Sequence, residues 1–101
     1  MRVSVLEPWR VLYEGNAEEV LLPGEDGELD VLDFHHPFVY RLRRGYIQVL
    51  RRSRRQGAQA PRRPQVESRI LIADGIARMA GNELVLLVTT PLPLAQGRAR
   101  V

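Results

Sequence analysis

The stretch Leu22-Pro23-Gly24-Glu25-Asp26-Gly27-Glu28-Leu29-Asp30-Val31-Leu32 decides the fold of this chain. It contains a Pro-Gly pair and an Asp-Gly pair, which favour tight turns because Pro presets φ and Gly accepts a positive φ. A short strand over 28–32 follows the turns. The stretch therefore predicts an exposed turn that carries the carboxylates of Glu25, Asp26 and Glu28.

Strand patterns continue on both sides of this turn. Apolar and polar residues alternate in Arg2-Val3-Ser4-Val5 and in Tyr46-Ile47-Gln48-Val49, and no helical apolar pattern persists for three turns. Short strands separated by turn residues are typical of antiparallel sandwiches and barrels. We expect an all-β fold, an antiparallel β-sandwich or flattened barrel of about nine to ten short strands. The expected strands are 2–6, 10–14, 17–22, 28–32, 38–42, 45–52, 66–73, 75–80 and 83–89.

Length and composition set the limits of the chain. Its 101 residues are enough for one domain, and the apolar fraction of 45% is ordinary for a folded protein. The longest apolar run, 84–88, is far below the roughly 20 residues of a membrane-spanning helix. No secretory signal is recognisable at the N-terminus, so a cytoplasmic protein is expected. The chain has no Cys, which excludes disulfides and thiolate metal sites.

Several of the expected strands are apolar on both faces, among them 66–73 and 83–89. Every residue of 84–88 is apolar, whereas an ordinary sandwich strand has a polar face toward water. Such a strand lies either deep in a closed barrel or in a contact surface. The sequence leaves both alternatives open.

The basic residues are unevenly distributed. All fifteen are Arg, and seven of them lie within nineteen positions: Arg51, Arg52, Arg54, Arg55, Arg62, Arg63 and Arg69. Breaker residues and like charges over 53–66 predict a long loop, and the prolines near the end predict a tail over 91–101. A basic segment of this kind can meet phosphates, anionic lipid headgroups or an acidic protein surface.

Three separated segments carry a resemblance to a known family. They are the stretch 22–32 with the Asp33-Phe34-His35-His36-Pro37 corner, the segment 5–20 with Tyr13-Glu14-Gly15, and the segment 73–88 with Asp74-Gly75. Over roughly residues 2–90 the chain resembles the N-terminal β-sandwich domain of the epsilon subunit of F-type ATP synthases. By this resemblance, residues 1–90 form the domain, 53–66 contain an insertion, and no C-terminal helical domain is expected. Phe34 stands where the family commonly has Gly, so we expect a negative φ or a changed corner there.

The resemblance implies a rotor subunit that is not itself an enzyme and needs no cofactor. It assigns c-ring docking to Glu25, Asp26, Gly27 and Glu28, which would meet ring loops rich in Arg, Gln and Pro. It assigns the gamma-subunit interface to His35, Phe38, Val39 and Arg41. The protein would lie at the cytoplasmic face of the membrane as a peripheral part of the complex. The alternative interpretation of the acidic residues is a solvated turn that binds no partner.

The Arg-rich segment gives the alternative function. Candidates for contact with an anionic surface are Arg51, Arg52, Arg54, Arg55, Arg62 and Arg63. The alternative is a stand-alone β-sandwich module that binds nucleic acid or another anionic surface through this loop, but the loop lacks the aromatic side chains that stack on bases. No phosphate-binding Gly-rich loop, nucleophile motif or metal-ligand cluster is present, so neither catalysis nor a metal site is expected.

Overall fold

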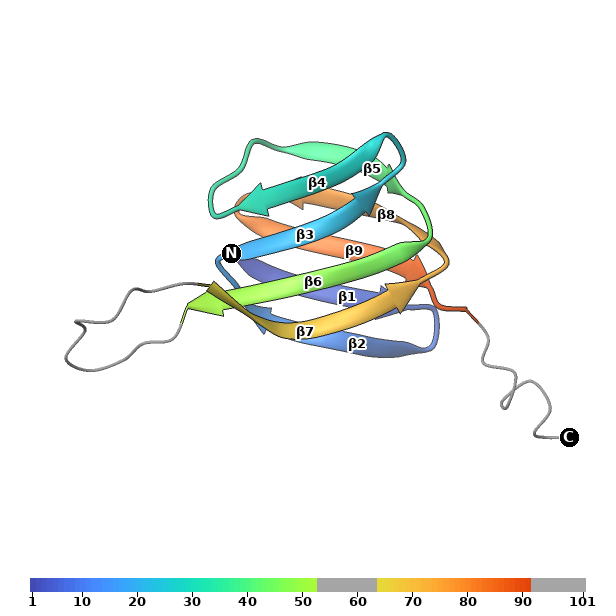
Figure 1. Cartoon of the computed structure of the whole chain (residues 1–101). Coiled ribbons are helices and arrows are strands. Elements are labelled where there is room, and N and C mark those ends of the chain that lie inside the picture. Colours follow the sequence, from blue (N-terminus) through green and yellow to red (C-terminus); the bar gives the residue numbers. More distant parts are fainter. Residues whose placement is uncertain (53–63, 92–101) are drawn as a thin grey trace, which may run out of the picture.

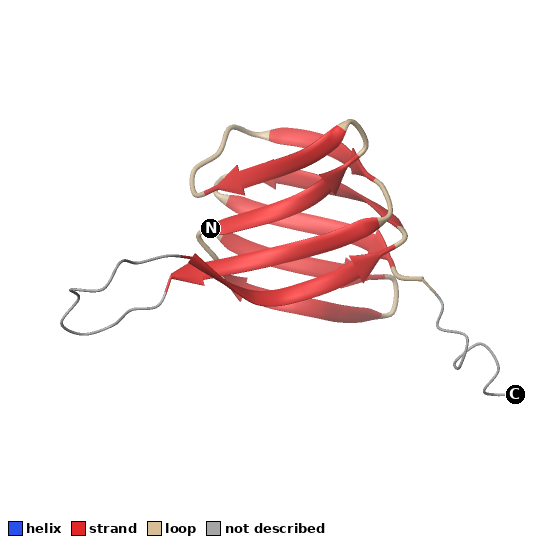
Figure 2. Cartoon of the chain, in the orientation of Figure 1, coloured by secondary structure: helices blue, strands red, loops and turns tan. Residues whose placement is uncertain are grey.

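The computed structural model describes residues 1–52 and 64–91, and it confirms the all-β prediction. This part of the chain contains no helix, and hence none that could cross a membrane (Figures 1 and 2). The strands are β1 (Arg2–Glu7), β2 (Arg10–Asn16), β3 (Glu19–Gly24), β4 (Gly27–Leu32), β5 (Phe38–Leu42), β6 (Gly45–Arg52), β7 (Pro64–Ile72), β8 (Asp74–Ala80) and β9 (Glu83–Thr89).

The strands form two packed layers (Figure 1). One layer, the five-stranded sheet, has the order β2-β1-β9-β8-β5, and the other, the four-stranded sheet, has the order β4-β3-β6-β7. A single residue pair, Gly24 with Leu42, joins β3 to β5 and so connects the layers. The result is a sandwich that is closed at one side by backbone pairing.

Most strand boundaries agree with the sequence-based expectations, but the start of β7 differs. β7 begins at Pro64 instead of 66, so residues 64–66 of the expected loop belong to a strand. Pro64 is tolerated because it is the first residue of a strand at the end of the sheet order, where a missing N–H costs little. The remainder of the Arg-rich loop, 53–63, and the expected tail beyond residue 91 lie outside the described residues.

One strand pair departs from the antiparallel prediction. β1 and β9 run parallel, with Val3 opposite Leu84 and Val5 opposite Leu86. Parallel neighbours need a long connection, and here the intervening seven strands provide it. Because the two strands are the first and the last, no local pattern indicates their pairing.

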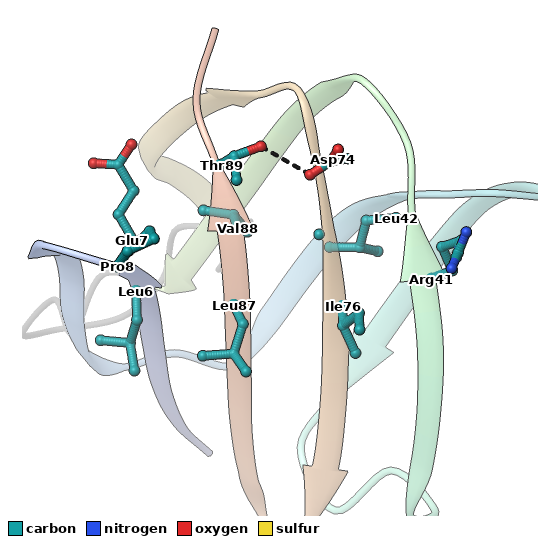
Figure 3. Close-up of a pocket in the computed structure, with 11 residues that line it drawn as sticks. Leu6, Glu7, Pro8, Arg41, Leu42, Asp74, Ile76, Leu87, Val88 and Thr89 are labelled. Carbon is teal, nitrogen blue, oxygen red and sulfur yellow. Dashed lines mark hydrogen bonds between the residues drawn. The ribbon is translucent and has the colours of Figure 1, made fainter.

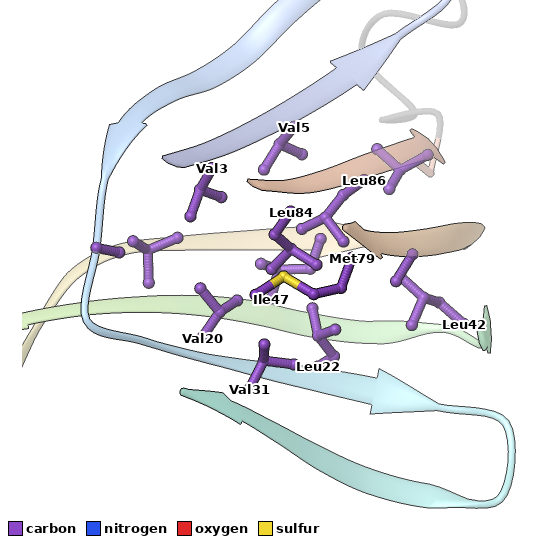
Figure 4. Close-up of a cluster of buried hydrophobic side chains, with 14 of the residues drawn as sticks. Val3, Val5, Val20, Leu22, Val31, Leu42, Ile47, Met79, Leu84 and Leu86 are labelled. Carbon is purple, nitrogen blue, oxygen red and sulfur yellow. The ribbon is translucent and has the colours of Figure 1, made fainter. Parts of the chain in front are cut away.

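The core lies between the two layers (Figure 4). The alternation within each strand directs every second side chain inward, for example Leu84, Leu86 and Val88 in β9. The largest wholly buried side chains come from both sheets: Leu22, Leu42, Ile47, Ile72, Met79, Leu84, Leu86, Val3, Val5, Val20, Val31 and Val49. The hydrophobic face shared by the sheets therefore stabilises the sandwich as one unit.

Side chains bridge the other side of the sandwich, between β2 and β7. The Tyr13 hydroxyl of β2 donates a hydrogen bond to Oε1 of Glu67 in β7, at 3.0 Å. Arg51 of β6 pairs with the same carboxylate, with 3.4 Å between Nη1 and Oε2. Burial and the Glu67 hydrogen bond raise the pKa of Tyr13.

Adjacent residues of β9 provide a test of the layered core. Leu86 is wholly buried, whereas Leu87 points outward and is 54% exposed. We expect Leu86→Ala to lower the free energy of unfolding by about 2–4 kcal/mol, because it leaves a cavity. Leu87→Ala should cost about 0.5 kcal/mol or less. Equal losses in denaturant titrations of the two variants would contradict the assigned register.

The Tyr13–Glu67 bridge predicts a pH-dependent stability difference. Because the pKa of Tyr13 is higher in the folded than in the unfolded protein, its contribution is complete below the unfolded pKa of about 10. That contribution is lost as the pH rises through the folded pKa. Tyr13→Phe should lower the free energy of unfolding by about 0.5–1.5 kcal/mol at pH 8 and by less above pH 10. Tyr40→Phe is the control, and a Tyr13→Phe loss that stays constant with pH would refute the prediction.

Candidate functional site

The acidic turn joins β3 to β4 at one end of the sandwich. Gly24 and Gly27 face each other across the hairpin, and Glu25 and Asp26 form its tip. A Cβ on Gly24 would lie 2.7 Å from the carbonyl oxygen of Gly27, and Gly27 itself has a φ of +133°, so both positions favour Gly. The carboxylates of Glu25, Asp26 and Glu28 are exposed, as the turn predicts, and none forms an ion pair within residues 1–52 and 64–91.

Backbone hydrogen bonds fix this turn to the rest of the molecule. The Glu25 N–H donates to the carbonyl oxygen of Arg41, at 2.9 Å, and the Arg43 N–H donates to that of Pro23, also at 2.9 Å. The turn and the end of β3 are thus held against the end of β5 and the β5–β6 connection. Its unpaired carboxylates are available for a basic partner.

The His35 corner lies at the opposite end, between β4 and β5. The Phe34 N–H donates to Oδ1 of Asn82, at 2.7 Å, and the His35 N–H donates to the carbonyl oxygen of Leu32, at 3.1 Å. Asp33 accepts a hydrogen bond from the N-terminal amine. Phe34 has a φ of +61°, which excludes the first of the two expected alternatives, a negative φ at this position. The Asn82 contact and the N-terminal contact hold the left-handed backbone that a Gly would adopt without strain.

The four residues assigned to the gamma interface do not share one surface. Val39 and Arg41 point outward from β5, on the outer face of the five-stranded sheet. Phe38 points to the other side, packs against the core and contacts the His35 ring, with centroids 5.1 Å apart. His35 lies at the end of the sandwich.

Apolar side chains cover much of the outer face of the five-stranded sheet. Leu6, Leu87 and Ile76 lie side by side on β1, β9 and β8, because the register pairs Leu6 with Leu87 and Leu87 with Ile76. Figure 3 shows the row, with Arg41 beyond it on β5. We call the outward side chains of Leu6, Val11, Val39, Ile76, Val85 and Leu87 the apolar face.

The exposed fractions of the outward side chains show how β9, which is apolar on both faces, lies in the sandwich. Ile76 is 45% exposed, Leu87 54% and Val39 68%. β9 therefore buries one row of apolar residues in the core and presents the other row in an outer surface. Neither Ile76 nor Leu6 was among the residues predicted to form a contact surface. In the sequence, Ile76 stands two residues before the charged Arg78, so the alternation of a strand places both side chains on the outer face.

A groove of about 560 Å³ crosses the apolar face at the start of β8 and the end of β9 (Figure 3). Leu6, Ile76 and Leu87 line it together with the polar side chains of Arg41 and Asp74. Asp74 accepts a hydrogen bond of 2.8 Å from the Thr89 hydroxyl. The groove is thus apolar at its centre and has charged groups at its margin, as protein interfaces commonly do. Arg78 of β8 adds a charge to the same face, between Val85 and Val39.

Glu7 holds the end of β9 beside the groove. Its carboxylate accepts a hydrogen bond of 2.7 Å from Nε of Arg10 and another from the Thr90 hydroxyl. These hydrogen bonds, that of Arg10 above all, lower the pKa of Glu7. The carboxylate therefore stays charged and links β9 to the β1–β2 turn near neutral pH.

The Arg-rich candidates are described only in part. The Arg51 side chain is half exposed and pairs with Glu67. Arg52 ends β6, and Arg54, Arg55, Arg62 and Arg63 lie outside the described residues. Leu50 lies beside Glu19 at the start of β3, so Arg51 and Arg52 lie at the opposite end of the sandwich from the acidic turn (Figure 1). Within the described residues, no three His, Cys, Asp or Glu side chains gather in a way that suits a metal ion.

Comparison with known proteins agrees with this architecture. Residues 1–92 match the profile of the family described as ATP synthase, Delta/Epsilon chain, beta-sandwich domain. The chain belongs to this family. The resemblance of the three sequence segments to epsilon subunits is thereby confirmed.

Two bacterial relatives illustrate the similarity. The ATP synthase epsilon chain of Bordetella avium is 28% identical over 95 residues, which are 94% of this chain and 60% of that protein. The ATP synthase epsilon chain 2 of Ralstonia nicotianae is 31% identical over 90 residues, which are 89% of this chain and 57% of that protein. The chain thus spans about three fifths of the length of these relatives.

Solved structures show the same fold. A chain in the cryo-EM structure of the Tetrahymena thermophila mitochondrial ATP synthase central stalk and c-ring superposes with a TM-score of 0.66 at 15% identity. The match covers 99% of this chain and 71% of that one. A chain of the Euglena gracilis mitochondrial ATP synthase gives a TM-score of 0.65 at 14% identity, covering 93% of this chain and 53% of that one.

Proposed function

We propose that this chain is a non-catalytic rotor subunit of a rotary ATP synthase, which couples the gamma subunit to the membrane c-ring. The observation that carries the proposal is the arrangement of two different surfaces on one sandwich of this family. An acidic turn with unpaired carboxylates lies at one end, and the apolar face covers one side. The relatives' name and the central-stalk neighbours support this function over a stand-alone module that binds nucleic acid.

The acidic turn suits the c-ring. Glu25, Asp26 and Glu28 are exposed and unpaired in the described part of the chain, and the backbone hydrogen bonds to β5 and to the β5–β6 connection fix the direction of the turn. Ring loops rich in Arg would pair with these carboxylates in a partly desolvated contact. The subunit would then lie peripherally at the cytoplasmic face of the membrane, with its acidic end toward the ring.

The apolar face suits the gamma subunit. Val39 and Arg41, two of the four residues assigned to that interface, lie on its margin, and Ile76, Leu87 and Leu6 extend it across the sheet. Covering exposed apolar side chains gives favourable association, and Arg41 adds a charged group that can select the partner. His35 and Phe38 lie at the end of the sandwich opposite the acidic turn, so they would contact gamma only at the edge of the apolar face.

Charge reversal tests the ring contact. Glu25→Arg with Asp26→Arg should weaken association with a purified complex of ring and gamma by about tenfold or more, because attraction becomes repulsion. The matched control, Asp30→Arg with Glu83→Arg, reverses two exposed carboxylates elsewhere. Both variants should remain folded. If the turn variant binds as tightly as the wild type in a pull-down titration, the acidic residues are a solvated turn and the ring contact lies elsewhere.

Polar substitution tests the gamma contact. Ile76→Thr with Leu87→Thr keeps residues that favour strands but removes apolar contact area, so binding to isolated gamma should weaken by about tenfold or more. Leu32→Thr with Val66→Thr is the control, because these side chains of the four-stranded sheet are similarly exposed, at 51% and 48%. A greater loss in the control pair, measured by calorimetry, would assign gamma to the other sheet.

A further inference from the structure

Three Arg side chains line a pocket next to the acidic turn. Arg43 and Arg44 belong to the β5–β6 connection, and Arg69 reaches the pocket from β7. The remaining lining comes from Pro23, Gly24, Gly27, Glu28, Tyr46 and Gln48. The pocket has a volume of about 310 Å³, at the lower end of the range for small-molecule sites. It opens on the four-stranded sheet, away from the apolar face.

The backbone around the pocket is tightly fixed. The Arg43 N–H donates to the Pro23 carbonyl oxygen, at 2.9 Å, which sets where the two consecutive Arg residues begin. Gly45 follows them, and a Cβ there would lie 2.7 Å from Cβ of Pro23. Only Gly lets β6 start this close to β3. The chain therefore places the Arg43-Arg44 pair at the mouth of the pocket through backbone contacts.

Arg69 is held from the opposite wall. Its guanidinium carbon lies 4.1 Å from the centre of the Tyr46 ring, a cation–π contact that orients the planar group. Arg69 is paired across the strands with Gln48, and Tyr46 is its diagonal neighbour. Tyr46 thus forms one wall of the pocket and supports one of its three cations.

Within the described part of the chain, the three guanidinium groups have no acidic partners of their own. Among residues 1–52 and 64–91, neither Arg43 nor Arg44 nor Arg69 forms an ion pair. Glu28 is the one carboxylate that lines the pocket, so its lining carries three positive charges and one negative charge. Like charges brought together repel one another, and a bound anion removes that repulsion.

We propose that this pocket binds a phosphate group. Guanidinium forks pair with phosphate through two parallel hydrogen bonds, and phosphate has enough oxygens to accept from all three Arg side chains at once. A carboxylate has only two oxygens and suits three converging forks less well. The volume leaves room for a substituent beyond the phosphate, such as the glycerol of a lipid headgroup.

Titration of the full, ¹⁵N-labelled chain with inorganic phosphate at constant ionic strength tests the site. The amide signals of Gly24, Gly27, Gly45 and Arg69 should shift saturably. Arg43→Gln with Arg44→Gln should weaken the affinity by about tenfold or more, whereas the corresponding Lys variants should lose less, because Lys keeps the charge without the fork. The same spectra show whether each variant is folded.

The matched control removes equal charge from the other sheet. Arg2→Gln with Arg78→Gln should change the phosphate affinity by about twofold or less. Equal loss in both Gln variants, shifts that rise linearly without saturation, or shifts located away from the pocket would overturn the proposal.

A second titration distinguishes the source of the phosphate. Co-sedimentation compares vesicles of phosphatidylglycerol with vesicles of phosphatidylcholine at the same salt concentration. Phosphatidylglycerol binding that the Arg43→Gln, Arg44→Gln variant loses assigns the pocket to a lipid headgroup. Saturable inorganic phosphate binding without vesicle binding assigns it to a free phosphate compound. Absence of binding in both titrations overturns the site.

Discussion

The corner where β3 meets β5 is the constraint on which the rest of the structure depends. Here the Gly24–Leu42 pair and the hydrogen bonds around it join the two sheets. Two glycines permit close approaches beside this corner: a Cβ on Gly24 would lie 2.7 Å from the Gly27 carbonyl oxygen, and a Cβ on Gly45 would lie 2.7 Å from Cβ of Pro23. The same corner directs the acidic turn outward and places the Arg43-Arg44 pair beside it. The fold and the two charged features therefore share one backbone arrangement.

The two outer faces of the sandwich differ in character. The five-stranded sheet presents a continuous apolar row, whereas the four-stranded sheet presents charged and polar groups around the Arg43–Arg69 pocket. A sandwich of packed sheets is stiff, because each strand is held by hydrogen bonds to its neighbours in the same sheet and by side-chain packing across the core. A stiff body with distinct surfaces at its end and on its side would suit the proposed rotor function, in which it transmits torque between two partners.

The structure places the basic end of β6 and the acidic turn at opposite ends of the sandwich, a separation that the sequence did not reveal. Arg51 lies at the far end of the sandwich from Glu25 and Asp26, because β6 extends past the start of β3. A flat ring surface at the acidic end would therefore not reach Arg51. The cations near that end include Arg41, Arg43 and Arg44, which lie outside the Arg-rich run, and Arg69, which is the last member of that run.

The sequence by itself determined the strands and the turns, because period-two alternation and Gly-containing turns are local signals. The resemblance of three segments indicated the family. It also placed Glu25 and Asp26 on an exposed turn. It did not determine the parallel pairing of β1 with β9, the outward row through Leu6, Ile76 and Leu87, or the meeting of Arg69 with the β5–β6 connection. Those features join residues far apart in the chain, and their register is set by which face packs into the core. Only the tertiary structure decides that, since burial is a property of the assembled layers and not of any one strand.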